Sequence, residues 1–304
     1  MRVLLAGATG AIGRQLLPLL LSTGHTVVGT SRSASGVAAI RAAGADAVRL
    51  DVFDRDATFQ ALADARPDAV IHQLTALGER RFDENARLRR EGTRNLVDAA
   101  VKAGTGQIVA QSISWVYGPG AAPATEDEPL DASREGLVGP ARALEEAAAS
   151  MERHVVLRYG LLYGPGTWYS PGGWAEGELR AGRIAAGPAV SSFVHVVDAA
   201  RAALLALDWP DGVVNVVDDE PATAWEWVPA LAAALDVPTP PPSATPDRSG
   251  ALALEAPASE APASGALPVG REGWERGASN AKARALGWRP AHPSWRTGFP
   301  ALTR

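Results

Sequence analysis

The chain has 304 residues, enough to bury a sizeable core in about two domains of ordinary size. Its 29 Lys and Arg residues against 34 Asp and Glu give a net charge of -5, which argues against a nucleic-acid partner held through phosphate contacts. Cysteine is absent, which excludes disulfides and thiol chemistry, and no two histidines have the spacing of a helical zinc motif, so no metal site is expected.

Short apolar strands alternate with helical segments from the first residues onward. The expected strands are 2–6, 26–30, 47–50, 69–73, 107–111 and 154–158, and the expected helices are 11–21, 36–43, 56–63, 82–102 and 139–151. This series predicts an α/β protein with a doubly wound, parallel Rossmann sheet covered by helices on both faces. The early apolar run at 16–21 is too short to cross a bilayer, so we expect a cytoplasmic protein without a membrane partner.

The pattern loosens after residue 163. Later segments predict strands at 193–196 and 213–217 and helices at 199–207, 225–235 and 280–286. We expect a nucleotide-binding domain of residues 1–163, to which 193–218 return, and a smaller substrate-binding region of 164–192 and 219–304. Within that region, the Pro- and Ala-rich segment 238–268 is expected to be a mobile loop. Trp168 and Trp174 are typical of an aromatic wall for a flat or apolar small-molecule substrate, or equally of core packing.

A glycine-rich turn connects the first strand to the first helix. Gly7 permits a tight turn, Gly10 lets the backbone approach a pyrophosphate, and Gly13 lets the helix pack closely on the sheet. The alternative is a tight turn with no ligand. We expect a dinucleotide here, bound by Gly7, Thr9, Gly10, Ala11, Ile12 and Gly13.

The end of the second strand bears on the choice between NAD(H) and NADP(H). An acidic residue at this point would bind the 2′-hydroxyl of the adenosine ribose and repel a 2′-phosphate. The sequence instead has Ser31 and Arg32, and a guanidinium forms charge-assisted hydrogen bonds with a phosphate. These residues favour NADP(H) over NAD(H), the alternative being that Arg32 is simply exposed to solvent.

Several motifs in the same order resemble the extended short-chain dehydrogenase/reductase family, the group of sugar epimerases and dehydratases. Besides the glycine turn, they are Asp51-Val52, residues 72–75, 92–96, 116–118, 158–159, 163–166, 193–198 and 282–290. The resemblance implies that Asp51 and Val52 meet the adenine and that Gln73, Leu74 and Thr75 lie beside the cofactor. It also implies a homodimer formed through helices 82–102 and 139–151.

The catalytic positions of that family are not matched. The family uses a Ser or Thr, followed by a Tyr and a Lys four residues apart. The hydroxyl position aligns with Ile113, and the Tyr and Lys positions align with Val138 and Arg142 when Glu146 serves as the usual downstream acid. A shift of one residue gives Leu137 and Ala141. No Tyr-x-x-x-Lys stands anywhere in the sequence.

Other groups near these motifs are candidates for the missing chemistry. Tyr117, Ser112, Ser114 or His195 are candidate proton donors, and Arg142 is a candidate for gripping the ribose or a phosphate, although it cannot serve as a base near neutral pH. Each also has a structural interpretation, as a packed or hydrogen-bonded group. Alternatively, the hydride acceptor needs little help from a proton.

Three functions therefore stay open. The first is an NADP(H)-dependent reductase or epimerase-like oxidoreductase acting on a small metabolite. The second is a non-redox isomerase, lyase or cyclase on the same fold, and the third is a non-catalytic NADP(H) sensor or scaffold. Among structural roles, we expect His72 to orient a strand end, Asp198 to cap a helix that starts at Ala199, and Arg158 to satisfy buried carbonyls.

Overall fold

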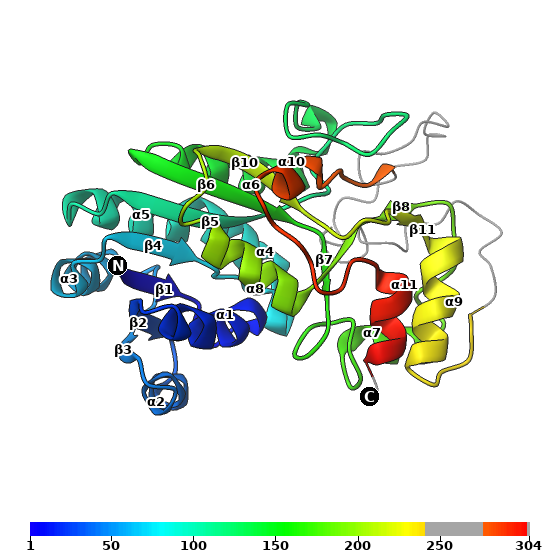
Figure 1. Cartoon of the computed structure of the whole chain (residues 1–304), viewed down its shortest axis with the longest axis horizontal. Coiled ribbons are helices and arrows are strands. Elements are labelled where there is room, and N and C mark those ends of the chain that lie inside the picture. The colour runs from blue at the N-terminus through cyan, green and yellow to red at the C-terminus, as the bar shows by residue number, and fades with distance from the viewer. Residues whose placement is uncertain (241–275, 303–304) are drawn as a thin grey trace. The chain divides into compact units, whose positions relative to one another are not determined.

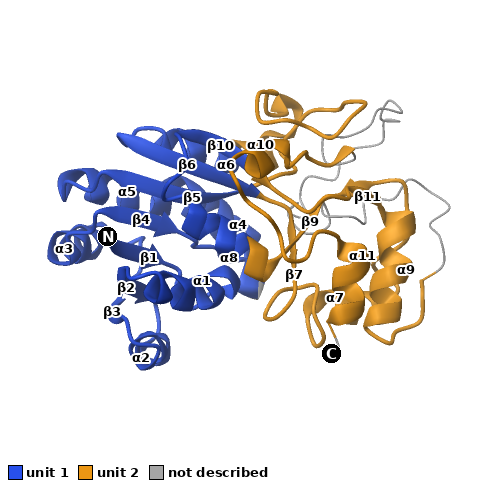
Figure 2. Ribbon diagram, viewed as in Figure 1, with its two compact units in different colours: residues 1–112, 140–158, 199–214 blue, residues 113–139, 159–198, 215–304 orange. Residues whose placement is uncertain are grey.

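The computed structural model describes residues 1–240 and 276–302. The chain divides into two compact units, each assembled from separated segments (Figure 2). Unit 1 comprises residues 1–112, 140–158 and 199–214, and unit 2 comprises residues 113–139, 159–198 and 215–304. This division differs from the expected one, because 113–139, 159–163, 193–198 and 215–218 group with the C-terminal residues. From residue 241 onward, the expected mobile loop lies outside the described residues.

A seven-stranded sheet organises unit 1, with the strand order β10-β6-β5-β4-β1-β2-β3 (Figure 1). The pairs β1–β2, β1–β4, β2–β3 and β4–β5 are all parallel, which confirms the predicted doubly wound Rossmann sheet. The strands are β1 (Arg2–Ala6), β2 (Thr26–Ser31), β3 (Asp46–Arg49), β4 (Ala69–His72), β5 (Gln107–Ile113), β6 (Arg153–Tyr159) and β10 (Gly212–Val216).

Helices alternate with these strands as the sequence predicts. They are α1 (Ala11–Ser22), α2 (Ala34–Ala42), α3 (Arg55–Ala65), α4 (Phe82–Arg87), α5 (Thr93–Lys102), α6 (Glu135–Ala148) and α8 (Val196–Leu205). One buried apolar cluster joins β1 and β4 to α3, α5 and α6, with Leu4, Val70, Leu62, Leu96 and Leu144 among its members. Burial of this apolar surface is the main driving force for the fold of unit 1.

The predicted helix 82–102 is divided by a π-helical turn at Leu88–Gly92. A Cβ at Gly92 would lie 2.9 Å from Val52 Cγ2, so a residue without a side chain is needed for this close approach. Single π turns inside helices are often found at functional sites. Here the turn lies in the segment that follows β4. The first residues of that segment, Gln73, Leu74 and Thr75, are expected to lie beside the cofactor.

Unit 2 contains short strands and an aromatic core. The strand β7 (Leu161–Tyr163) pairs in parallel with β9 (Phe193–His195), and β8 (Val190–Ser191) pairs antiparallel with β11 (Ala222–Thr223). The helices are α7 (Trp174–Arg180), α9 (Ala224–Ala234), α10 (Ala281–Ala285) and α11 (Trp295–Gly298). The ring of Phe193 makes edge contacts with Trp227 and Phe299, at centroid distances of 5.3 and 5.2 Å.

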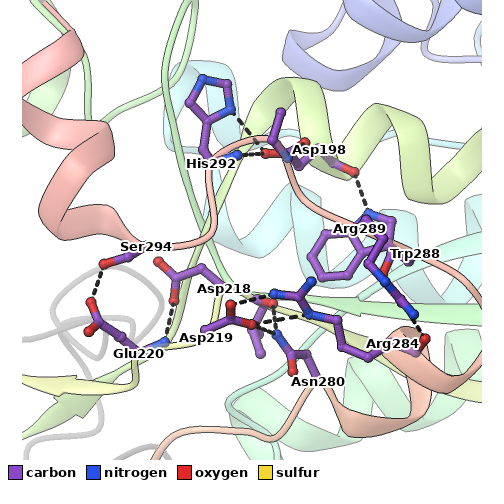
Figure 3. A network of polar contacts seen from close by, with 12 residues as sticks. Asp198, Asp218, Asp219, Glu220, Asn280, Arg284, Trp288, Arg289, His292 and Ser294 are labelled. Carbon is purple, nitrogen blue, oxygen red and sulfur yellow. Dashed lines mark hydrogen bonds and ion pairs between the residues drawn. The ribbon is translucent and has the colours of Figure 1, made fainter.

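A polar network holds the C-terminal segment of unit 2 in place (Figure 3). The Asp198 carboxylate accepts hydrogen bonds from the backbone amides of Ala291 and His292, at 2.7 and 2.8 Å. The prediction that Asp198 caps a helix at Ala199 is therefore wrong, because α8 begins at Val196 and the carboxylate is used by a distant segment. Trp288 Nε1 also donates to the Asp198 carbonyl, and Asp218 accepts from the amide of Trp295.

Asp218 gives this network a pH dependence. Burial raises the pKa of its carboxyl from the ordinary 3.8 to about 8, although hydrogen bonds from the amides of Trp295 and Glu220 oppose the shift. The folded chain therefore keeps a proton that the unfolded chain releases between about pH 4 and pH 8, so this residue makes stability fall as pH rises through that range.

Asp218→Asn should remove that contribution. We measure the free energy of unfolding of the variant and of the wild type in urea. We expect the difference between them to shift steadily in favour of the variant as pH rises from 5 to 8. Asp236→Asn, at an exposed position after α9, is the matched control and should show no such trend. A difference between Asp218→Asn and wild type that stays constant over this range would contradict the burial argument.

Candidate functional site

The turn between β1 and α1 has the close contacts that a dinucleotide site requires. Gly7 has a φ of +90°, and a Cβ at this residue would lie 2.7 Å from the Gln73 carbonyl oxygen. A Cβ at Gly13 would lie 2.2 Å from the Gly7 carbonyl oxygen, so α1 packs directly on the turn. Gly10 caps α1 without a side chain, which leaves the first-turn amides of the helix open to an anion.

The end of β4 adds an unsatisfied polar group beside this turn. Gln73 is buried, and neither its side-chain oxygen nor its side-chain nitrogen has a hydrogen-bond partner among the described residues. His72 is also buried, and its Nδ1 accepts from the amide of Leu74 at 3.2 Å, which confirms that this histidine orients the strand end. Burial, together with the positive charge of Arg89, lowers the pKa of His72 to about 4, so the imidazole is neutral at pH 7.

These residues fit a nicotinamide dinucleotide. Buried polar atoms are normally hydrogen-bonded, so the Gln73 amide calls for a ligand, and the glycine turn leaves room for one. Of the other expected contacts, Leu74 and Thr75 are half-buried, Val52 is buried and Asp51 is exposed. The Asp51 carboxylate accepts from the amide of Phe53 at 3.1 Å.

Basic and hydroxyl side chains gather at the end of β2. Ser31 is buried, and the half-exposed Arg32 donates to Glu84 at 2.8 Å. The Oγ of Ser33 accepts from the amide of Gly36 and so caps α2. Arg49, which the sequence analysis did not single out, donates from Nε to the Arg32 carbonyl oxygen at 3.0 Å. Arg49 is opposite Ser31 in the register of β2 and β3. The sequence does not reveal this proximity, because it depends on how the two strands pair.

A buried ion pair joins α6 to β6 in unit 1. Arg158 donates from Nε and Nη2 to the two oxygens of Glu145, at 2.9 and 2.6 Å, and Ser112 Oγ donates to Glu145 Oε1 at 2.6 Å. The guanidinium of Arg158 therefore has a carboxylate partner that the sequence did not predict, and its expected bonds to buried carbonyls stay a prediction. Ser112 is fully buried, and its hydroxyl proton is engaged by this pair.

This ion pair also bears on the alignment of α6. Glu145 is buried, whereas Glu146, the acid used to align the helix, is exposed. The structure therefore favours the register shifted by one residue, in which Leu137 and Ala141 stand at the Tyr and Lys positions. Arg142 is half-buried next to Ala141, and its role toward the ribose stays a prediction.

Two of the candidate proton donors are packed into polar networks of unit 2. Tyr117 is fully buried and donates from its hydroxyl to Asn215 Oδ1 at 2.6 Å. The amide group of Asn215 in turn donates to the Ala124 carbonyl at 3.2 Å. His195 is buried, and its ring stacks on that of His292 at a centroid distance of 3.7 Å. These contacts fit the structural interpretation of both residues, and a role as proton donor stays a prediction for each.

His195, Asp198 and His292 also lie close enough together to be considered as metal ligands, with ligand atoms within 4.8 Å of one another. However, the Nδ1 of His292 faces Asp198 at 3.0 Å, and the Nδ1 of His195 accepts from the amide of Val197 at 3.3 Å. The bond from Val197 engages the Nδ1 lone pair of His195, so this nitrogen is not open to a metal. We therefore assign these residues to anchoring the C-terminal segment.

Ser114 belongs to a different environment, a small pocket within unit 2. The pocket is lined by Ser114, Trp115, Leu161, Val190, Ser191, Ser192 and Gly277. Tyr117 and His195 do not line it, so the structure does not bring the three candidates together. Trp168 and Trp174 do not line it either. Their rings pack against each other at 5.7 Å, and the aromatic residue of the pocket is Trp115, which the sequence analysis missed.

None of the helices in the described part of the chain combines the length and the apolar character needed to cross a bilayer.

Comparisons with known proteins show what the whole chain is similar to. The profile of the NAD dependent epimerase/dehydratase family matches residues 3–217. A 3-diazoavenalumate denitrifying reductase from a Streptomyces species is 42% identical over 98% of this chain and 99% of its own length. A UDP-glucose 4-epimerase from Mycolicibacterium smegmatis is 35% identical, but over only 43% of this chain and 45% of its own.

Among solved structures, the UDP-glucose 4-epimerase of Thermus thermophilus in complex with NAD superimposes with a TM-score of 0.75. It is 25% identical and covers 99% of this chain and 97% of its own. The structural likeness therefore extends through both units, whereas the likeness in sequence over the full length is stronger to the reductase.

Proposed function

Because this chain belongs to the NAD dependent epimerase/dehydratase family, we propose that it is an NADPH-dependent reductase that removes the diazo group of a small aromatic acid as N₂. The observation that carries this proposal is the 42% identity, over nearly the whole of both chains, to a protein named as a denitrifying reductase of a diazo carboxylate. The lack of a Tyr-x-x-x-Lys motif supports it through the chemistry of the step.

The family's ordinary substrates require a proton donor on the protein, whereas a diazo compound does not. Reduction of a carbonyl creates an alkoxide, and a positioned acid accelerates such a step about 10²–10⁴-fold. A reduced nicotinamide, when bound, supplies a hydride, and its exchange for a diazo group forms a C–H bond and expels N₂ with no alkoxide to protonate. Leucine and alanine at positions 137 and 141 are therefore compatible with this reaction.

The residues of unit 1 would hold the cofactor. The first-turn amides of α1 would bind the pyrophosphate at Gly10, and the side chain of Gln73 would donate to or accept from the nucleotide beside Gly7. Ser31 and Arg32 would bind a 2′-phosphate at the end of β2, where the phosphate would replace Glu84 as the partner of the Arg32 guanidinium.

The choice of NADPH is tested at Arg32. Arg32→Ala should weaken the binding of NADPH about tenfold to a hundredfold, because a charge-assisted hydrogen bond is worth roughly 1.5–3 kcal/mol, and should leave the binding of NADH nearly unchanged. Calorimetric titration of both cofactors measures the difference. Arg41→Ala, on the exposed face of α2, is the control. An equal loss of affinity for NADPH and NADH would contradict the assignment of a 2′-phosphate site.

The reaction itself is tested with diazotised 3-amino-4-hydroxycinnamate as substrate. NADPH oxidation followed at 340 nm and N₂ release followed by mass spectrometry should rise together in a 1:1 ratio. UDP-glucose in place of the diazo acid should give neither epimer nor NADPH oxidation. Conversion without net NADPH loss would support a non-redox enzyme, and NADPH binding without any conversion would support a sensor.

A further inference from the structure

We infer that the pocket of unit 2 binds a ring oxygen of the aromatic substrate, through the indole N–H of Trp115 and the hydroxyl of Ser191. This inference rests on the proposed function, since it names the part of the substrate that unit 2 recognises. It concerns residues that neither the resemblance nor the motif analysis had identified.

Two polar atoms of the pocket residues lack partners. Trp115 Nε1 and Ser191 Oγ are both shielded from solvent, and neither has a hydrogen-bond partner among the described residues. An indole N–H can only donate, and a serine hydroxyl can donate or accept. Other shielded polar atoms in the chain also lack partners, but these two belong to residues that line one pocket. A ligand atom that accepts from both would satisfy them together.

The remaining lining residues define what kind of atom that is. Leu161 and Val190 are apolar, and no charged residue is among those that line the pocket. Ser192 already accepts from the amide of Ala278 at 2.9 Å. Neutral donors between apolar walls suit a phenol, phenolate or ketone oxygen better than a phosphate, which proteins bind with cations or helix N-termini.

The local fold keeps this pocket small. Ser191 lies on the two-residue strand β8, whose pairing with β11 fixes the direction of its side chain. Gly277 has a φ of +67°, and a Cβ there would lie 2.5 Å from Pro221 Cβ and 2.8 Å from Ser192 Oγ. A larger residue at 277 would therefore displace the segment that closes the pocket. The space suits one oxygen atom of a larger substrate.

An oxygen held in this way has a chemical consequence. When a hydroxyl stands next to the diazo carbon, the oxygen shares its electrons with the diazo group and makes it a poorer hydride acceptor. Two hydrogen bonds donated to that oxygen withdraw electron density and restore the diazonium character. Ser114, which also lines the pocket, would be a contact residue for the ring rather than a general acid.

The test compares two probes that differ only in the ring oxygen, 4-hydroxycinnamate and cinnamate, titrated calorimetrically into the full-length protein saturated with NADP⁺. Wild type should bind 4-hydroxycinnamate about tenfold more tightly, as expected for two donors left unsatisfied by cinnamate. Trp115→Phe and Ser191→Ala should each reduce this preference severalfold, and the double variant should bind the two probes equally. Trp168→Phe, a half-buried tryptophan outside the pocket, should keep the full preference.

Three results would overturn the inference: equal binding of both probes by wild type, no binding of either, or a preference that survives in the double variant. Thermal unfolding of each variant shows whether Ser191→Ala, the smaller change, is folded when Trp115→Phe is not. Release of N₂ is measured on the same samples. If the probe preference follows the prediction while no diazo compound is reduced, the proposed function fails and the pocket assignment stands.

Discussion

Replacement of Glu145 by alanine should lower the free energy of unfolding by about 3–5 kcal/mol, the usual loss when one partner of a buried ion pair is removed. Arg158 would then keep a buried guanidinium without its bidentate carboxylate, and the hydroxyl of Ser112 would lose its acceptor. Both partners are nearly inaccessible, with side-chain exposures of 5% for Arg158 and 10% for Glu145, so water cannot replace the lost bonds. Urea unfolding followed by circular dichroism measures the effect.

The neighbouring Glu146 provides the control for this prediction. It is exposed on the same helix, so Glu146→Ala should change stability by no more than about 0.5 kcal/mol. The pair of variants also tests the register of α6. Equal destabilisation by the two substitutions, or a larger effect of Glu146→Ala, would show that the carboxylate facing β6 has been assigned to the wrong residue.

Gly13→Ala should weaken NADPH binding about tenfold to a hundredfold. The added Cβ would lie 2.2 Å from the Gly7 carbonyl oxygen and 2.8 Å from Ala8 Cα, both of them backbone atoms that cannot move without shifting the turn. Overpacking of this kind costs about 1–3 kcal/mol, and the strain falls on the amides that face the pyrophosphate.

Calorimetric titration with NADPH and thermal unfolding without it separate loss of binding from loss of folding in this variant. Gly177→Ala is the matched control, because a Cβ at Gly177 meets nothing within 4 Å. Wild-type affinity in Gly13→Ala would show that the turn does not carry the cofactor. A change in unfolding temperature with unchanged affinity would lead to the same conclusion.

The sequence was most informative where periodicity and turn chemistry agree. Unit 1 has strands of four to seven residues separated by helices, and the glycine turn between β1 and α1 has the close contacts that its spacing predicted. The short strands β7, β8 and β11 were missed, because two or three residues are too few for an alternating pattern to emerge. The helix α7 was not predicted, because the glycines and prolines around it interrupt the helical pattern.

Long-range polar contacts were the main source of error. Asp198 has the position of a helix cap in the sequence, but its carboxylate binds amides of the C-terminal segment. Glu145 and Glu146 are adjacent and chemically identical, so only the direction of the helix face identifies the partner of Arg158. The pocket of unit 2 draws residues from several separated segments, and no spacing in the sequence would have joined Trp115 to Ser191.

The proposed reduction needs no positioned acid, because no alkoxide is formed. Single-turnover rates of NADPH oxidation by diazotised 3-amino-4-hydroxycinnamate, measured in H₂O and in D₂O between pH 6 and pH 9, test it most directly. We expect equal rates in the two solvents and no pH dependence beyond that of the substrate itself. A rate several times slower in D₂O, or an ionisation in the pH profile that disappears in Tyr117→Phe or Ser114→Ala, would contradict it.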